Sequence, residues 1–200
     1  METLQNGQNA SLVMLAFLQA DCRDSDYSKE LNSLGTHLNL TKDINSNSHW
    51  PDSQEDEGLE CDGHLPCSSS SITELLHGIQ PVAELRWPQD REEAAALRGI
   101  AEDLREVAAQ LEHNVVARAT QNLSRNIQVC PSEQWTYFLA NEVERVMRQG
   151  VGLGLEHLPQ ERVIVALTLT LVRGVCEQAP RMLIGLFNSA LQYIWRAGPR

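Results

Sequence analysis

Large apolar residues recur three and four positions apart over the stretch 97–111. They are Leu97, Ile100, Leu104, Val107 and Leu111, and the positions between them are mostly small or charged. On an α-helix this spacing forms one narrow apolar stripe along a single face. Such a helix packs into the core of its own protein or fills a groove on another protein. The residues Asp90-Arg-Glu-Glu93 resemble a capping box, so we predict that the helix starts there, and we expect it to run past Val115.

Other apolar patterns predict helices on both sides of this stripe. Helices are expected over residues 11–20, 25–38, 116–127, 131–148, 161–176 and 181–195. The ten residues 163–172 are uncharged and almost all apolar, which indicates a buried helix. Their valines and threonines leave a strand as the alternative, but the length of the segment and its helical neighbours favour a helix. The chain shows no strand-rich block and no internal repeat, so we predict an all-α fold.

The helical pattern stops between Thr41 and Pro88. This stretch is rich in asparagine, acidic residues, proline and a run of four serines, Ser68–Ser71. Polar stretches of this length are functional loops or disordered segments. We therefore divide the chain into N-terminal helices over 1–40, a flexible acidic loop over 41–89 and a C-terminal helical part over 90–200.

Charge and motif content exclude several classes of protein. The formal net charge of the 200 residues is −11. Such an acidic chain is a poor partner for nucleic acid, which selects basic surfaces. The five cysteines are scattered without a metal-ligand spacing, so we expect free thiols in a reducing compartment and no metal or cofactor. We expect no secretory signal, because the N-terminus lacks a basic segment, and no run reaches the ~20 apolar residues of a spanning helix. No nucleophile, phosphate-loop or zinc-hydrolase motif occurs, so an enzyme is not expected.

Three parts of the chain resemble the Bcl family of apoptosis regulators, in particular its death agonists. The matching stretches are Leu15-Ala-Phe-Leu-Gln-Ala20 with Tyr27-Ser-Lys-Glu-Leu-Asn-Ser-Leu-Gly-Thr-His-Leu38, then Gly99-Ile-Ala-x-x-Leu104-x-x-Val107, and finally Val165-Ala-Leu-Thr-Leu-Thr-Leu-Val172 with Pro180-Arg-Met-Leu183 and Leu186-Phe187. The resemblance implies a Bcl-family-like bundle of about seven or eight helices around a central apolar helical hairpin, with a long disordered loop. It also implies a latent cytosolic precursor. An initiator caspase cuts the loop, and the C-terminal fragment then moves to the mitochondrial outer membrane and promotes its permeabilisation and cytochrome c release.

The resemblance gives the stripe helix the role of a death motif that binds pro- and anti-apoptotic Bcl-family proteins. The expected partner-binding residues are four apolar anchors and one small residue, namely Ile100, Leu104, Val107, Leu111 and Ala108. The family usually has an aspartate at the next position, where this chain has Ala109. A second register, which runs from Glu93 through Leu97 to Leu104, places Glu102 at the aspartate position. The helix can also be a purely structural element of the core.

The loop contains a candidate cleavage site, Leu59-Glu-Cys-Asp62-Gly63. Caspases cut after aspartate, favour glutamate two residues earlier and accept a small residue afterwards. We therefore expect cleavage between Asp62 and Gly63, with Asp56 and Asp90 as weaker candidates. The alternative is an ordinary Asp-Gly turn in an acidic loop.

We expect the hairpin over 161–195 to contact membranes after cleavage. The residues expected to do so are Val163, Leu167, Leu171, Leu186 and Phe187. In the intact chain they would fill the core, and in the fragment they would lie in the membrane interface. Neighbouring arginines would then meet anionic mitochondrial lipid.

Two other classes of protein remain as alternatives. One is a non-apoptotic helical adaptor whose amphipathic helix is a fixed core or coiled-coil seam. The other is a protective, groove-bearing Bcl relative, but the chain lacks an Asn-Trp-Gly-Arg-like signature and its last residues, Trp195–Arg200, are not a hydrophobic anchor.

Overall fold

Helices form nearly all of the chain that the computed structural model describes, which is residues 7–20, 22, 24–42, 83–150 and 155–197. The α-helices are α1 (Gly7–Gln19), α2 (Ser25–His37), α4 (Arg91–Ala109), α5 (His113–Val129), α6 (Trp135–Gln149), α7 (Gln160–Gln178) and α8 (Leu183–Ala197). Short 3-10 turns are η2 (Ser132–Gln134), η3 (Leu155–His157) and η4 (Pro180–Met182). The prediction of an all-α bundle is confirmed within these ranges.

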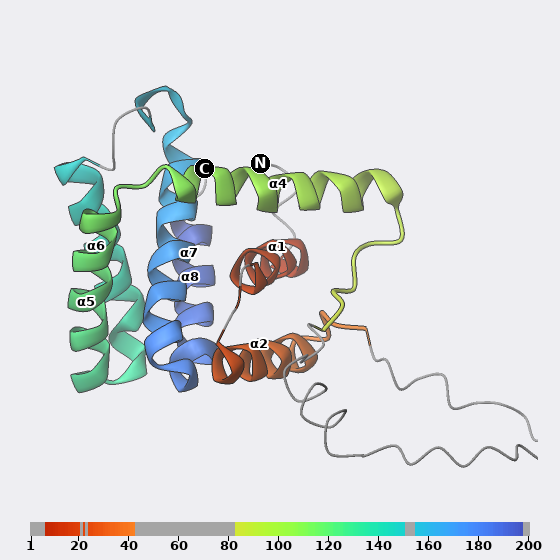
Figure 1. Ribbon diagram of the computed structural model, residues 1–200, viewed down its shortest axis with the longest axis horizontal. Helices are drawn as coiled ribbons and strands as arrows, with labels where there is room; N and C mark the ends of the chain where they lie inside the picture. Colours follow the sequence, from red (N-terminus) through yellow and green to blue (C-terminus); the bar gives the residue numbers. More distant parts are fainter. Residues whose placement is uncertain (1–6, 21, 23, 43–82, 151–154, 198–200) are drawn as a thin grey trace, which may run out of the picture.

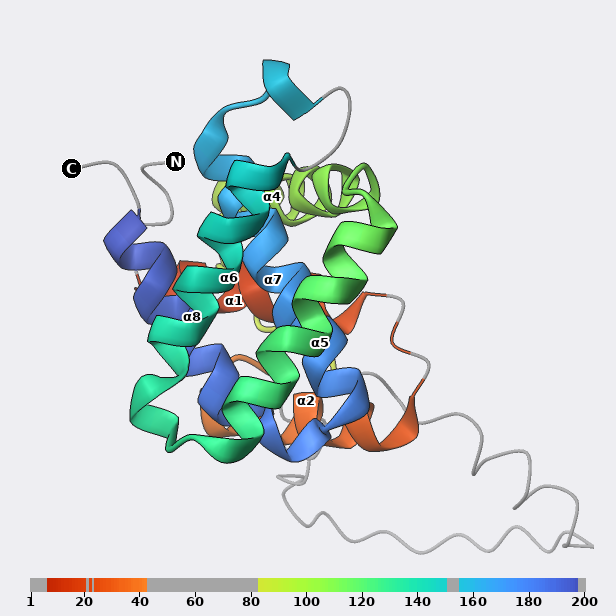
Figure 2. The same ribbon diagram turned by 90° about the vertical axis from the view of Figure 1, so that its left-hand side faces the viewer.

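Helix α7 is at the centre of the bundle, where it packs against α1, α4, α5, α6 and α8 (Figures 1 and 2). Ten of its residues are buried. The hydroxyls of Thr168 and Thr170 donate to the carbonyls of Ile164 and Ala166, each at 2.7 Å. These bonds satisfy the threonine hydroxyls inside the apolar helix. The segment is therefore a buried helix, and the strand alternative is wrong.

The turn η4 joins α7 to α8, and together they form the expected apolar hairpin. Helix α8 has one buried face and one exposed face, on which Ile184 is 42% and Trp195 56% exposed. At Gly185 the helix comes so close to α6 that an added Cβ would overlap the ring of Trp135. The indole of Trp135 is fixed in place because its Nε1 donates to the carbonyl of Cys130 at 3.2 Å.

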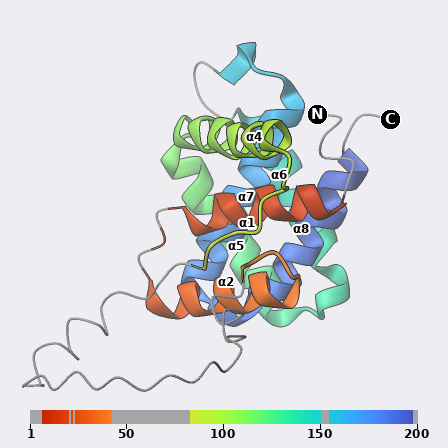
Figure 3. The ribbon, with the colours of Figure 1, turned by 90° about the vertical axis from the view of Figure 1, so that its right-hand side faces the viewer.

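Helix α1 shares the centre of the fold with α7, which its sequence did not predict. It lies between α4 and α2, as Figures 1 and 3 show. Nine of its thirteen residues are buried, so hardly any face of this helix is left for solvent. Its buried polar groups have partners: Ser11 Oγ donates to the carbonyl of Gly7 at 2.9 Å, and Asn9 Nδ2 donates to Glu93 Oε1 of α4 at 2.9 Å.

The backbone on either side of residues 43–82 is paired. Thr41 and Leu85 form an isolated antiparallel β-bridge, in which Lys42 N donates to Glu84 O at 2.8 Å and Arg86 N donates to Leu40 O at 2.6 Å. Leu40 and Leu85 are buried, which holds the pairing against the bundle. Within the predicted loop over 41–89, the residues at its two ends that the structure describes are thus paired with each other. The rest of the loop, with Asp62 and Gly63, lies outside the described residues.

Candidate functional site

Helix α4 carries the apolar stripe and starts where the sequence predicts. The Asp90 carboxylate accepts the backbone N–H groups of Glu92 at 2.8 Å and Glu93 at 3.2 Å. This is an N-cap, and the two glutamates in the first turn favour the positive end of the helix dipole. The side chain of Glu93 bonds to Asn9 of α1, so the start of α4 is tied to the N-terminal helix.

The end of α4 comes earlier than predicted. The helix stops at Ala109, and the backbone N–H groups of Gln110 and Leu111 close short turns on Val107 O and Ala108 O at 3.1 and 3.2 Å. Such short turns are typical of a helix terminus. The apolar spacing continues from Leu111 to Val115, but Val115 is already on α5. The expectation that the helix runs past Val115 is wrong, because the chain turns there so that α5 packs against α6 and α7.

The stripe of α4 faces α1 and α7, which fill the space that a partner groove would fill. Its five buried residues are Ala94, Leu97, Ala101, Leu104 and Val107. Of the predicted anchors, Leu104 is 2% and Val107 5% exposed, and Leu111 is 8% exposed just beyond the helix end. Ile100 and Ala108 are half-buried at the margins of the same face. The structure thus brings all five predicted motif residues to one side of α4, and the chain itself covers that side.

Apolar packing, more than charge, holds α4 in place. The Asp103 carboxylate of α4 pairs with Arg162 of α7 at 3.4 Å, and both side chains are about half exposed. An exposed ion pair of this kind contributes about 0–1 kcal/mol. Burying each large apolar side chain of the stripe contributes about 1.5–3 kcal/mol. The stripe residues therefore dominate the energy of the closed state.

A hollow of about 560 Å³ lies beside the C-terminal half of α4. Phe17 of α1 lines it together with Ala108 and Ala109 of α4. Because Phe17 is only 2% exposed, its ring is part of the core at the point where α1 meets the end of the motif helix. Arg105 and Arg173 also line the hollow.

Comparison with known families identifies the family to which this helical chain belongs. A model of the BH3 interacting domain (BID) family matches residues 2–197. The chain belongs to the BH3 interacting domain family. Neither the curated proteins nor the solved structures gave a match. As a member of this family the chain is an apoptosis-related regulatory protein and does not belong to a family of enzymes.

In this BH3 interacting domain protein the hairpin residues predicted to contact membranes are buried. Val163, Leu167, Leu171, Leu186 and Phe187 are at most 2% exposed. Of the nearby arginines, Arg162, Arg181 and Arg196 are exposed, whereas Arg173 is half-buried and pairs with Glu177 at 2.8 Å. Among the helices that the structure describes, none combines the length and the apolar character needed to cross a bilayer.

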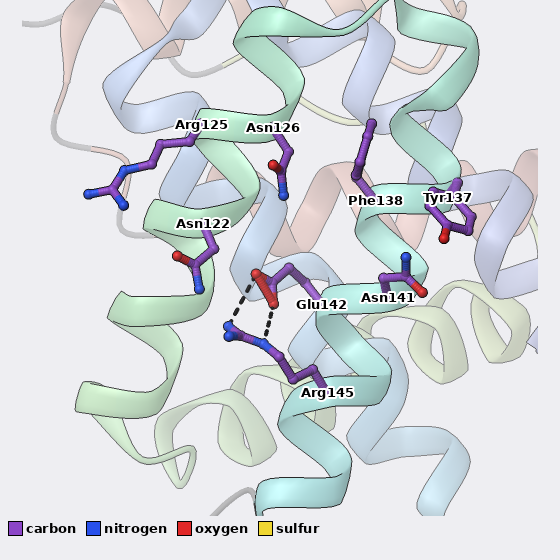
Figure 4. Close-up of a pocket in the computed structure, with 8 residues that line it drawn as sticks. All are labelled: Asn122, Arg125, Asn126, Tyr137, Phe138, Asn141, Glu142 and Arg145. Carbon is purple, nitrogen blue, oxygen red and sulfur yellow. Dashed lines mark hydrogen bonds and ion pairs between the residues drawn. The ribbon is translucent and has the colours of Figure 1, made fainter.

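Sequence reasoning missed a polar cluster between α5 and α6 (Figure 4). Glu142 is 6% exposed and its carboxylate pairs with the Arg145 guanidinium at 2.7 Å. Burial raises the pKa of Glu142, and the charge of Arg145 opposes that rise. The cluster lies on elements other than α4, which carries the predicted motif residues. The signal in the sequence was the recurrence of asparagine at 122, 126 and 141.

The described cysteines, Cys22, Cys130 and Cys176, are unbridged. Burial raises the pKa of the Cys176 thiol to about 12, so this side chain is protonated at neutral pH and inert as a nucleophile. Within the described ranges no cluster of three metal-ligating side chains occurs.

Proposed function

We propose that this chain is a latent pro-apoptotic regulator that a caspase activates by cutting between Asp62 and Gly63. The observation that carries the proposal is the position of α1. This helix covers the stripe of α4, and it precedes residues 43–82 in the chain whereas α4 follows them. A cut at Asp62 therefore breaks the covalent connection between the motif helix and the helix that covers it.

The cut changes the thermodynamics of the closed state. In the intact chain α1 is tethered to α4, so its effective concentration beside the stripe is high. After the cut, residues 1–62 are a separate chain that gains translational freedom when it leaves. The net charge of residues 1–62 is −9 and that of residues 63–200 is −2, so electrostatic repulsion weakly favours separation.

Release of α1 would uncover two apolar surfaces. On α4, Leu104 and the other anchors would become available to the grooves of pro- and anti-apoptotic Bcl-family proteins. On α7, the face that packs on α1 would be exposed, which favours insertion of the α7–α8 hairpin into a membrane interface. The exposed arginines near the hairpin would favour the anionic lipid of mitochondria. The chain would thus pass from the cytoplasm to the mitochondrial outer membrane and promote cytochrome c release.

The experiment is a reconstitution with an initiator caspase and isolated mitochondria. The full chain is incubated with both, and cleavage and cytochrome c release are measured together. We expect Asp62→Ala to abolish both, while Asp56→Ala, in the same acidic stretch, changes neither. Leu104→Glu should be cut normally but release no cytochrome c, because a charge replaces the central anchor.

A matched control for Leu104→Glu is Ala96→Glu, which adds the same charge at an exposed position of the same helix. It should release cytochrome c like the unaltered chain. Normal cytochrome c release by the cut Leu104→Glu variant would refute the role of α4. A fragment that keeps α4 covered and is inert beside mitochondria would instead be the structural adaptor.

A further inference from the structure

A groove of about 600 Å³ runs between α5 and α6, on helices that do not carry the death motif (Figure 4). Three asparagines line it: Asn122 and Asn126 come from α5 and Asn141 from α6. Arg125 lies at the outer rim, and the ring of Tyr137, which is 65% exposed, lies at the start of α6. Three of its lining residues, Arg125, Asn126 and Asn141, are exposed, so a peptide can reach the groove from solvent.

The floor of the groove is a polar cluster around the buried carboxylate of Glu142. Arg145 Nη2 donates to Glu142 Oε1 at 3.1 Å, and Arg145 Nε meets Glu142 Oε2 at 2.7 Å as an ion pair without hydrogen-bond geometry. With its amide oxygen turned toward the guanidinium, Asn122 accepts from Arg145 Nη1 and Nη2 at 3.1 and 2.7 Å. These contacts hold Asn122 and Arg145 in fixed positions at the base of the groove.

The spacing of the asparagines fits the main chain of an extended peptide. Asn122 and Asn126 are four residues apart on α5, which places their Cα atoms about 6 Å apart along the helix axis. An extended peptide repeats every two residues, or about 6.6 Å. The Asn126 amide offers both donors and an acceptor, and so can pair with a peptide N–H and a peptide carbonyl. The oxygen of Asn122 already accepts from Arg145, so its NH2 group is the part that can donate to a peptide carbonyl. Two successive amides can therefore bind alternate residues of one strand.

The charge of the groove indicates which side chains a bound peptide would carry. The groove holds two arginines, Arg125 and Arg145, against the single carboxylate of Glu142. This local excess of positive charge occurs in a chain whose net charge is −11. We infer that the α5–α6 groove binds an extended acidic peptide segment of a partner protein. The asparagine amides bind its main chain, Arg125 binds a carboxylate, and Tyr137 packs on an apolar side chain.

The test is a fluorescence-polarisation titration of the full chain with a labelled peptide of alternating glutamate and serine. We expect saturable binding that weakens as salt is added. Arg125→Glu should weaken binding by about tenfold or more, because a charge-assisted hydrogen bond is lost. Asn126→Leu should weaken it several-fold. Both residues are exposed, and thermal melts are expected to show that both variants fold.

The matched control is Arg118→Glu, which makes the same charge change at an exposed position of α5 outside the groove. It should bind the peptide nearly as well as the unaltered chain. Equal losses for Arg118→Glu and Arg125→Glu would mean non-specific attraction and overturn the proposal. Undiminished binding of the same peptide with an N-methylated main chain would also overturn the proposal. Methylation removes the peptide N–H groups, so the asparagine amides would not be binding the main chain. The proposal would also be overturned if the chain bound no peptide but bound anionic lipid vesicles in a way that depends on Arg125.

Discussion

The deepest test of latency is Phe17→Ala, which loosens the cover of the motif helix without changing that helix. Phe17 is buried on α1 and lines the hollow beside Ala108 and Ala109 at the end of α4. Deleting a buried phenylalanine ring destabilises a core by about 3–5 kcal/mol. Only part of that cost falls on the contact between α1 and α4, because the ring also packs against the rest of the core.

The expected change in binding affinity follows from the free energy needed to separate α4 from the bundle. Opening exposes Leu97, Leu104 and Val107, and at about 1.5–3 kcal/mol each the cost is about 5–9 kcal/mol. The intact chain should therefore bind a Bcl-family groove about 10³ to 10⁶ times more weakly than the isolated segment 90–112. Phe17→Ala should recover roughly 10- to 100-fold of that loss, which corresponds to about 1.4–2.8 kcal/mol of the packing energy.

The assay is a competition in fluorescence polarisation. A labelled peptide of residues 90–112 occupies the groove of a protective Bcl-family protein, and intact chains compete for it. All chains carry Asp62→Ala so that none is cut. Phe187→Ala is the control, because it deletes an equally buried ring on α8, whose main contacts are α2, α6 and α7. Intact wild-type chain that competes as strongly as the peptide would refute the reasoning. If Phe17→Ala and Phe187→Ala increased the affinity for the groove equally, global unfolding and not release of α4 would be what exposes the stripe.

Three further predictions concern single positions. Ala109→Asp introduces the acidic residue that is usual in the family at this position. Calorimetry should show that this variant binds the groove of a Bcl-family protein more tightly, by up to about 3 kcal/mol. Urea unfolding should show a free energy of unfolding that is lower by about 0.3–1 kcal/mol, because the new negative charge lies at a helix C-terminus. Gly185→Ala should destabilise the fold by about 1–3 kcal/mol because its methyl group overlaps Trp135, whereas Gly99→Ala, with open space around it, should stabilise α4 by up to about 1 kcal/mol. The raised pKa of Glu142 means that the folded state binds its proton more readily than the unfolded state, so its contribution to stability is largest below the ordinary carboxyl pKa and falls as pH rises through the folded value. The urea midpoint of the Glu142→Gln variant should not show this decrease with rising pH. Identical pH profiles of the urea midpoint for the variant and the unaltered chain would contradict the prediction.

Local signals in the sequence were sufficient for most elements of the fold. The N-cap at Asp90 and the apolar run over 163–172 predicted α4 and α7, because capping and periodicity depend on near neighbours. The end of α4 was not predictable in this way. The apolar spacing passes without a break from Leu111 to Val115, and only the tertiary packing of α5 shows that the chain turns between them.

Features that depend on distant contacts were not predicted. The apolar residues of α1 indicated a buried helix, but nothing local shows that it lies between α4 and α2. Glu142 occupies a polar position of an amphipathic helix, and nothing in the local sequence indicates that it is buried. Arg145, one turn further along α6, pairs with its carboxylate, and Asn122 of α5 contacts Arg145 across the α5–α6 interface. Partner-binding roles at Leu104 and its neighbours come from the resemblance to the family and stay predictions.

The β-bridge between Thr41 and Leu85 places the two ends of a forty-residue insertion next to each other on the surface of the bundle. Once the ends are fixed in this way, the length of the intervening chain has little influence on the fold, since each doubling of a loop changes the closure entropy by only about 0.6 kcal/mol. Changes in the length or sequence of residues 43–82 are therefore expected to leave the packing of the helices beneath them largely unaltered.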